Sequence, residues 1–141
     1  MRIALISCTK SKDTVPCMAK DMYLKSDLFT KASTYVKQNN YDNWFILSAK
    51  YGLLSKEEVI EPYNLTLKTM KTMERKQWSL KVLNQLEENV QGQYSVDFYA
   101  SKKYREYLIP ELEEKGIKCT IPLEGKGIGE QLGFYKTHIK K

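Results

Sequence analysis

Hydrophobic residues fall in short, separate runs along the chain, and four of these runs are typical of buried strands. Each is bounded by small or polar turn residues and shows no strict alternation, as expected for strands that are covered on both faces. These runs occupy residues 2–7, 43–47, 94–99 and 117–121. The pattern therefore predicts four strands that lie inside the protein.

Between these runs, apolar residues recur every three or four positions, which predicts helices. The first helix begins at Ser26 or Asp27, both good N-caps, and ends at Asn39 and Asn40. Three more helices are predicted at about 69–90, 101–115 and 129–139, and Gly116 is suited to end the third. Residues 13–22 and 48–67 show neither period and are predicted as loops.

Strands and helices alternate through the whole sequence. Such alternation favours parallel strands that are joined by helical crossovers. We therefore predict an α/β fold, a Rossmann-like three-layer sandwich with a mostly parallel sheet of about four strands. The 141 residues suit a single domain that covers 1–141.

The chain is basic, with 23 lysine and arginine residues against 17 acidic residues and a formal net charge of +6. This balance favours polyanionic partners such as a nucleotide, a nucleobase-containing anion or nucleic acid. A basic enzyme with a solvated lysine surface would show the same balance, so charge alone does not identify the partner.

Cysteine and histidine usage argues against a metal site. The chain has Cys8, Cys17 and Cys119 but no Cys-x-x-Cys pair, and His138 is its one histidine. We expect no metal and no cofactor. The odd cysteine count and the lack of a signal peptide predict a cytoplasmic protein, and no apolar run is long enough to cross a membrane.

Polar residues and glycines collect where the predicted strands end. In open α/β sheets, ligands bind beyond the carboxyl ends of the strands. Here those ends are residues 7–10, 48–52, 100–103 and 122–129. We therefore expect a binding site at this edge of the sheet.

The end of the first strand offers hydroxyls, a thiol and two ammonium groups to a phosphate or a base edge. These belong to the run Ser7-Cys8-Thr9-Lys10-Ser11-Lys12, in which Ser7, Cys8, Thr9 and Lys10 are the expected site residues. Cys8 is a candidate nucleophile if a nearby cation or base lowers the pKa of its thiol, and is otherwise a structural thiol. Ser26 is expected on the same wall.

A glycine-rich turn precedes the last predicted helix. Gly125, Gly127 and Gly129 leave backbone N–H groups bare at a helix N-terminus, where a phosphate can bind. The spacing matches neither a Walker loop nor a dinucleotide fingerprint. The two interpretations are a phosphate cradle and a flexible turn.

The segment 48–67 is long for a connection and rich in tyrosine, leucine and lysine. We expect it to form the floor and cover of the pocket. Lys50 is a candidate to orient a phosphate or act as an attacking amine. Glu61 and Glu124 are candidate acid–base groups or partners of a base amino group, and both also fit solvated carboxylates. The other expected contacts in the segment are Ser48, Tyr51, Gly52 and Tyr63.

Three tyrosines near the predicted strand ends are candidates for base stacking, namely Tyr23, Tyr51 and Tyr63. Tyrosines also fill the rims of cores while their hydroxyls stay hydrated. Both roles are open for each ring.

Taken together, the motifs resemble a small domain of unknown function from bacteria and their phages. The resemblance rests on five segments: Ser7-Cys8-Thr9-Lys10, the set Tyr23, Ser26, Leu28 and Phe29, Leu47-Ser48-Ala49-Lys50-Tyr51-Gly52-Leu53, Glu61-Pro62-Tyr63, and the stretch from Pro122 to Leu132. The third and fourth of these segments are also similar to the YaaA peroxide-stress family. That family has Leu-Ser-x-x-Tyr-Gly-x-Leu followed by Pro-Tyr-x-Leu.

A further likeness is to the core domain of archaeosine synthase, through Pro16, Cys17, Tyr23 and Ser26. Asp21 and Phe29 stand where that domain has lysine and histidine. These resemblances imply a nucleobase-linked or nucleic-acid-linked role, and YaaA-type proteins are associated with DNA binding and protection from oxidative damage.

From the strand ends, the charge and these motifs, we expect a protein that binds a nucleobase, nucleotide or nucleic acid. It would be a candidate enzyme of base modification or N-glycosidic bond chemistry, with Lys50, Glu61 and Cys8 as catalytic candidates. The alternative is a non-enzymatic DNA- or RNA-binding module related to stress or phage biology. The sequence leaves open whether catalysis occurs.

Overall fold

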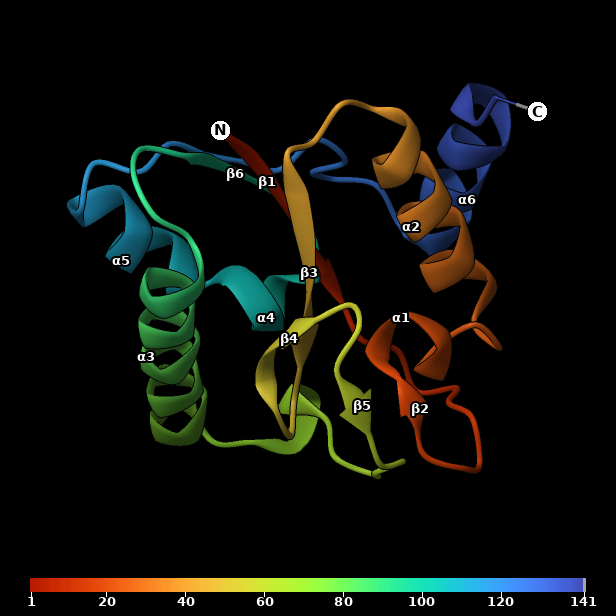
Figure 1. Cartoon of the computed structure of the whole chain (residues 1–141), viewed down its shortest axis with the longest axis horizontal. Helices are drawn as coiled ribbons and strands as arrows, with labels where there is room; N and C mark the ends of the chain where they lie inside the picture. The colour runs from red at the N-terminus through yellow and green to blue at the C-terminus, as the bar shows by residue number, and fades with distance from the viewer. Residues whose placement is uncertain (141) are drawn as a thin grey trace.

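A five-stranded sheet forms the centre of the protein in the computed structural model, which describes residues 1–140 (Figure 1). The strand order is β4-β3-β1-β6-β7. β1 pairs in parallel with β3 and with β6, β6 pairs in parallel with β7, and β4 runs antiparallel to β3. All four predicted strands are confirmed as one parallel set. The bounds are β1 Arg2–Ser7, β3 Asn43–Ser48, β4 Gly52–Ser55, β6 Ser95–Tyr99 and β7 Cys119–Thr120.

Helices cover both faces of this sheet. α2 (Asp27–Gln38) packs with α6 (Ile128–His138) on one face, and α3 (Thr72–Asn89) packs with α5 (Leu108–Glu114) on the other (Figure 1). The predicted three-layer α/β sandwich is confirmed. Because both faces are covered, residues 3–6 of the central strand are all apolar and almost completely buried.

α2 begins where its capping residue predicts. The side-chain oxygen of Ser26 accepts a hydrogen bond from the backbone N–H of Phe29, at 3.2 Å. This bond satisfies one of the backbone donors that a helix start leaves free. It also holds Ser26 at the carboxyl edge of the sheet, beside the end of β1.

The two segments predicted as loops contain short regular elements, so that prediction was wrong in part. β4 raises the number of strands in the main sheet from about four to five. β2 (Cys17–Met18) pairs antiparallel with β5 (Val59–Ile60) as a separate two-stranded sheet, beside α1 (Ala19–Met22). A 3-10 turn, Leu67–Thr69, precedes α3. Elements of two to four residues are too short for a hydrophobic period to reveal.

The helix predicted from Ser101 is divided into two. α4 (Lys102–Arg105) ends before α5, although Tyr104, Leu108 and Leu112 are buried as predicted. Pro110 explains the break, because it has no N–H to donate to the carbonyl of Glu106 and its ring would collide with that carbonyl.

The turn from β3 into β4 depends on one glycine and one glutamine. Gly52 has φ +77°, a left-handed conformation that disfavours any residue with a Cβ. Gln85 of α3 accepts a hydrogen bond from the N–H of Leu53 at 2.8 Å and donates one to the carbonyl of Tyr51 at 3.2 Å. α3 is thereby attached to the edge of the sheet.

We expect Gly52→Ala to destabilise the protein more than Gly116→Ala. Both positions have positive φ, so each substitution costs roughly 1–2 kcal/mol of backbone strain. At Gly52 the new Cβ would also collide with Oε1 of Gln85, whereas nothing lies within 4 Å at Gly116. The loss of the Gln85 hydrogen bonds adds about 1–3 kcal/mol. Urea unfolding of both variants measures the difference, and equal destabilisation would contradict the role given to Gln85.

Candidate functional site

Two adjoining hollows lie where β1 and β6 end. The larger has a volume of about 770 Å³, which is within the range of small-ligand pockets, roughly 300–1,000 Å³. From β1 the chain proceeds to β3 on one side, and it later returns through α3 to β6 on the other side. This reversal of strand order makes the crevice between β1 and β6 a topological switch point, where open α/β sheets bind ligands. We call the larger hollow the switch-point cavity.

Five segments from distant parts of the sequence line the switch-point cavity. They are the end of β1 with the loop that follows it, the start of α2, the approach to α3, the connection from β6 into α4, and one side of α6. The lining residues are Ile6, Ser7, Cys8, Thr9, Lys10, Ser11, Lys12, Ser26, Leu28, Phe29, Ala32, Asn64, Leu65, Thr66, Lys68, Thr69, Tyr99, Ala100, Ser101, Tyr104, Ile128, Gln131 and Tyr135.

The charged side chains of this lining are all cationic. They are Lys10, Lys12 and Lys68, and no aspartate or glutamate is among the lining residues. An anion that enters the cavity therefore meets attraction without a nearby carboxylate to oppose it. Hydroxyl groups of serines and threonines add neutral hydrogen-bonding groups on the same walls.

Lys12 is the most constrained of the three lysines. Its ammonium group donates to the carbonyl of Lys10 at 3.3 Å and lies 4.6 Å from the ring centre of Tyr63. Burial lowers the pKa of Lys12 below its usual value, and the neighbouring Cys8 opposes this shift. A partly desolvated ammonium interacts more strongly with an anion than a fully hydrated one.

Cys8 and Tyr104 form a polar pair on the cavity wall. The thiol of Cys8 donates to the hydroxyl oxygen of Tyr104 at 3.3 Å. Burial, followed by the nearby Cys8, raises the pKa of Tyr104, so its phenol stays protonated at neutral pH. The pair supplies the cavity with a thiol and a neutral hydroxyl.

Six of the residues predicted for the site lie around the two hollows. Ser7, Cys8, Thr9, Lys10 and Ser26 line the switch-point cavity. Gly125 lines the smaller hollow beside it. Residues from the first strand end, the start of α2 and the glycine turn are thus brought together as the sequence predicts.

The predicted floor of the pocket is instead part of a buried hydrogen-bond network. The hydroxyl of Ser48 donates to that of Tyr63 at 2.8 Å, and the hydroxyls of Tyr63 and Tyr23 are 2.7 Å apart. Ser48 also accepts from the N–H of Tyr51 at 3.1 Å. Because Ser48 and Tyr23 are completely buried and line neither hollow, these groups fix the fold of the 48–67 segment. Burial is also the main cause of the raised pKa values of Tyr23 and Tyr63.

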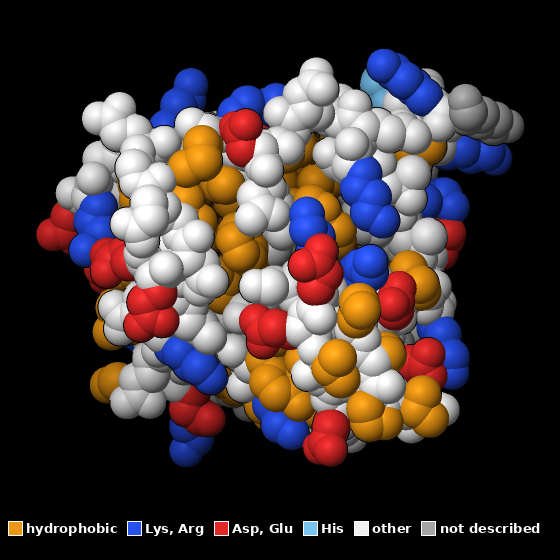
Figure 2. Space-filling model, in the orientation of Figure 1, with side chains coloured by type: hydrophobic (Ala, Val, Ile, Leu, Met, Phe, Trp, Pro, Cys, Tyr) orange, Lys and Arg blue, Asp and Glu red, His pale blue; other side chains and the backbone are white. Residues whose placement is uncertain are grey.

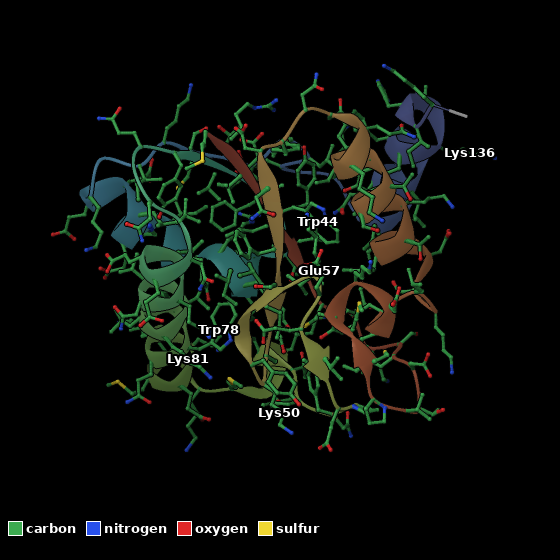
Figure 3. All side chains as sticks on the ribbon, viewed as in Figure 1. Trp44, Lys50, Glu57, Trp78, Lys81 and Lys136 are labelled. Atoms are coloured by element: carbon green, nitrogen blue, oxygen red, sulfur yellow. The ribbon has the colours of Figure 1, made fainter. Side chains whose placement is uncertain are left out.

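The remaining predicted residues lie outside both linings. Lys50 and Glu61 are exposed, and Figure 3 shows Lys50 at the lower end of the molecule. Gly52 is buried against Gln85. Glu124, Gly127 and Gly129 are exposed. The N–H of Gly127 is bonded to the Glu130 carboxylate at 3.3 Å, which places a negative charge at the start of α6, where a phosphate cradle was predicted.

Sequence reasoning missed much of the cavity wall. Lys12 is an exception, because it belongs to the polar run after the first strand that the sequence indicates as a phosphate contact. Phe29, Tyr104 and Tyr135 fall on the buried faces of helices, and in the sequence they look like ordinary core residues. The segment from Asn64 to Thr69 also lines the cavity, and it follows directly after Tyr63, which the network at Ser48 holds in place.

The fold and the cavity define an α/β sandwich protein with a lysine-bearing hollow at its switch point. The chain belongs to the DUF6884 family, a family of unknown function, which matches residues 3–137. It is 32% identical over 145 residues to the uncharacterized protein YfjM of Bacillus subtilis (strain 168), a match that covers 93% of this chain and 90% of that protein. No solved structure matches the chain.

These comparisons agree with the predicted domain of unknown function, and the likeness to the YaaA and archaeosine synthase families stays a prediction. Within residues 1–140, no group of three or more histidine, cysteine, aspartate or glutamate side chains is placed to hold a metal ion. None of the helices in the same range combines the length and hydrophobicity that crossing a bilayer requires.

We expect Ser48→Ala to lower the free energy of unfolding by about 1–3 kcal/mol, because the buried Tyr63 hydroxyl and Tyr51 N–H each lose a partner. Ser33→Ala is the matched control. Ser33 is also buried, but its hydroxyl bonds only to the Thr30 carbonyl of its own helix and alanine has the higher helix propensity, so the loss of this hydroxyl should cost less than the loss of the Ser48 hydroxyl. Chemical denaturation measures both, and equal effects would contradict a structural role for the network.

Proposed function

We propose that this protein binds a phosphorylated nucleoside in the switch-point cavity. The observation that carries the proposal is the composition of the lining: three lysines as its charged side chains, several hydroxyls, and a large apolar remainder, all at the switch point of the sheet. A nucleotide has the complementary parts, namely an anionic phosphate, a polar sugar and a flat base.

The phosphate fits the side of the cavity formed by the loop after β1. Lys10 and Lys12 supply positive charge there, and Ser7 and Thr9 supply hydroxyl donors. The start of α2 adds Ser26 to the same lining, and the carboxylate in the first turn of this helix, Asp27, is paired with Lys31 at 2.6 Å. These contacts explain why an anion would prefer this wall.

The base fits the apolar side. Leu28, Phe29 and Ala32 come from α2, and Leu65 comes from the segment before α3. Aromatic and aliphatic side chains make favourable contact with the face of a base, while Asn64 and Thr66 offer polar groups to its edge. A hollow lined by both cationic and apolar side chains favours a nucleotide over inorganic phosphate.

The chemistry of the lining supports binding more strongly than glycosidic bond cleavage. Glycoside hydrolysis commonly uses a pair of carboxylates, and no carboxylate lines the cavity. The potential nucleophiles in its lining are the thiol of Cys8, the amines of Lys10, Lys12 and Lys68, and the serine and threonine hydroxyls. Among these, Cys8 and the half-buried Lys12 are the candidates that we favour. A base-modifying step, if it occurs, would use one of these two groups.

A non-enzymatic nucleic-acid module remains the alternative and would need a continuous basic surface. On the face shown in Figure 2, lysine and arginine side chains are interspersed with acidic ones. The concave cavity therefore gives better support to a ligand of nucleotide size.

We expect Lys12→Ala to weaken nucleoside monophosphate binding by roughly 10-fold. A charge-assisted hydrogen bond contributes about 1.5–3 kcal/mol to binding, and it contributes less when the charged group is partly hydrated. Lys81→Ala is the control, since Lys81 is exposed on α3 (Figure 3) and is not among the lining residues of the cavity. A second variant, Lys50→Ala, distinguishes the switch-point cavity from a site at Lys50. It should bind nucleotides like wild type if the cavity is the site. Titration calorimetry with a panel of nucleotides gives the affinities.

Two results would contradict the proposal. One is a wild-type protein that binds no nucleotide of the panel at millimolar concentration. The other is loss of binding in Lys50→Ala with normal binding in Lys12→Ala, which would move the site to the exposed end of β3. Affinity that falls steeply with salt for long oligonucleotides alone would favour the nucleic-acid module.

A further inference from the structure

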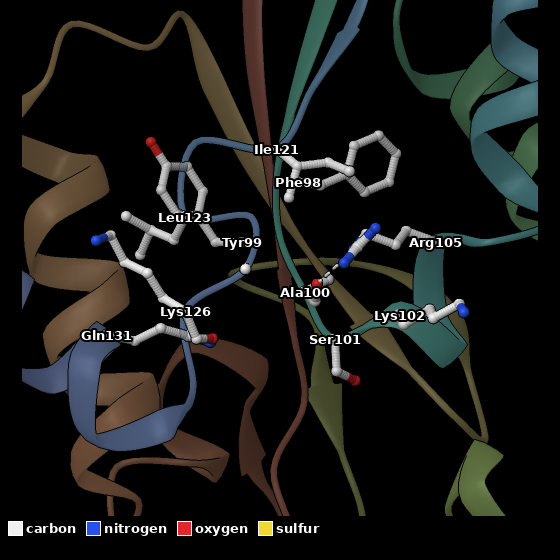
Figure 4. Close-up of a pocket in the computed structure, with 11 residues that line it drawn as sticks. Phe98, Tyr99, Ala100, Ser101, Lys102, Arg105, Ile121, Leu123, Lys126 and Gln131 are labelled. Carbon is white, nitrogen blue, oxygen red and sulfur yellow. Dashed lines mark hydrogen bonds between the residues drawn. The ribbon is translucent and has the colours of Figure 1, made fainter.

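A second hollow of about 200 Å³ opens beside the switch-point cavity, and we call it the side hollow (Figure 4). The two share part of their walls, because Tyr99, Ala100, Ser101 and Gln131 line both. The shared residues come from the end of β6 and from α6. A ligand in the cavity thus has the side hollow as its immediate neighbour.

The side hollow is also cationic. Its charged lining residues are Lys102, Arg105 and Lys126, and no carboxylate is among its lining residues. Figure 4 shows Lys102 and Arg105 on one side and Lys126 with Gln131 on the other. None of the ion pairs found within residues 1–140 involves these three cations. Their charge is therefore available to a ligand.

Arg105 is held in place without using its outer nitrogens. Its Nε–H donates to the carbonyl of Ala100 at 3.1 Å, and the side chain is half-buried (Figure 4). Within the described chain, no hydrogen bond engages its two Nη groups. A fixed guanidinium with free Nη–H groups is suited to bind a phosphate through two parallel hydrogen bonds.

The opposite wall is also fixed before any ligand arrives. Gln131 donates from its side-chain nitrogen to the carbonyl of Lys126 at 2.9 Å, which attaches the turn to α6. The N–H of Lys126 donates to the carbonyl of Leu123 at 3.1 Å, and Gly125 has φ +83° between them. A wall that needs no rearrangement spares the ordering cost of binding.

From this juxtaposition we infer that the side hollow is a second phosphate site for the same ligand. The inference rests on the proposed function and narrows its substrate class to nucleotides that carry two phosphate groups. One phosphate would lie by Lys10 and Lys12, and the other between Arg105 and Lys126. A nucleoside diphosphate, a nucleoside 3′,5′-bisphosphate and a 5′-phosphorylated dinucleotide share this chemistry.

The test compares these ligands with a nucleoside 5′-monophosphate by titration calorimetry. Wild type should bind at least one of the three two-phosphate ligands roughly 10-fold more tightly than the monophosphate, as one additional charge-assisted contact predicts. Arg105→Ala should remove this preference and leave monophosphate affinity within about 2-fold of wild type. The ligand with the largest preference identifies the spacing of the two phosphates.

Two further variants serve as a second test of the side hollow and as a control. Lys126→Ala tests the opposite wall and stands in for Arg105→Ala if that variant does not fold, which a thermal melt shows. Lys136→Ala, an exposed lysine farther along α6, is the control and should keep the full preference (Figure 3).

Three results would overturn the inference. If wild type binds the monophosphate and shows no preference for two phosphates, or if the side-hollow variants weaken all ligands equally, the side hollow is not a phosphate site while the proposed function stands. If no phosphorylated nucleoside binds wild type, the proposed function fails as well.

Discussion

The position of β1 at the centre of the sheet determines where a ligand can bind. β1 pairs in parallel on both sides, and parallel neighbours require crossover connections over the faces of the sheet. The crossover to β3 leaves on one side and the later approach to β6 arrives on the other. The chain segments that follow β1 and β6 therefore diverge, and the crevice between them stays open at the carboxyl edge. The cavity is a consequence of strand order, and the side chains at the two strand ends give it its chemistry.

The carboxyl end of β3, on the same edge of the sheet, is closed by the protein itself. β3 also ends at the carboxyl edge, but the chain turns back at once at Gly52 and pairs as β4. Gln85 holds this turn, and the hydroxyls of Ser48, Tyr63 and Tyr23 bond to one another behind it. Their buried polar groups are already satisfied, so they have little left to offer a ligand. This is why the polar residues after β1 and after β3 have such different surroundings.

The fold was predictable from sequence because its long elements have strong periods. The run from Arg2 to Ser7 and the cap at Ser26 appear in the structure as predicted. The missed elements, such as β4 and β2, are too short to carry a hydrophobic period. β4 forms because β3 offers it a free edge of the central sheet, and β2 forms because the distant segment β5 lies beside it. Local pattern cannot report a pairing that depends on tertiary contacts.

The site was predictable only in part, for a related reason. The general rule for α/β sheets pointed to the edge where the cavity opens, and Ser7 to Lys10 line that cavity. The same rule gave equal weight to Ser48, because a sequence does not show which strand end is sealed by its own turn. Phe29 and Tyr104 resemble core residues in the sequence, and only the packing of their helices shows that they also border a hollow.

The distribution of charge links the fold to the proposed ligand. The protein has 17 acidic residues, yet the linings of both hollows contain none of them and together contain six cations. Glu130, one of the nearest carboxylates along the chain to the glycine turn, bonds to the backbone of its own helix start. Like charges gathered around a concave surface repel one another, and that repulsion costs stability unless an anion relieves it. Because the two linings supply no carboxylate to these cations, their charge favours the anionic ligand that we propose.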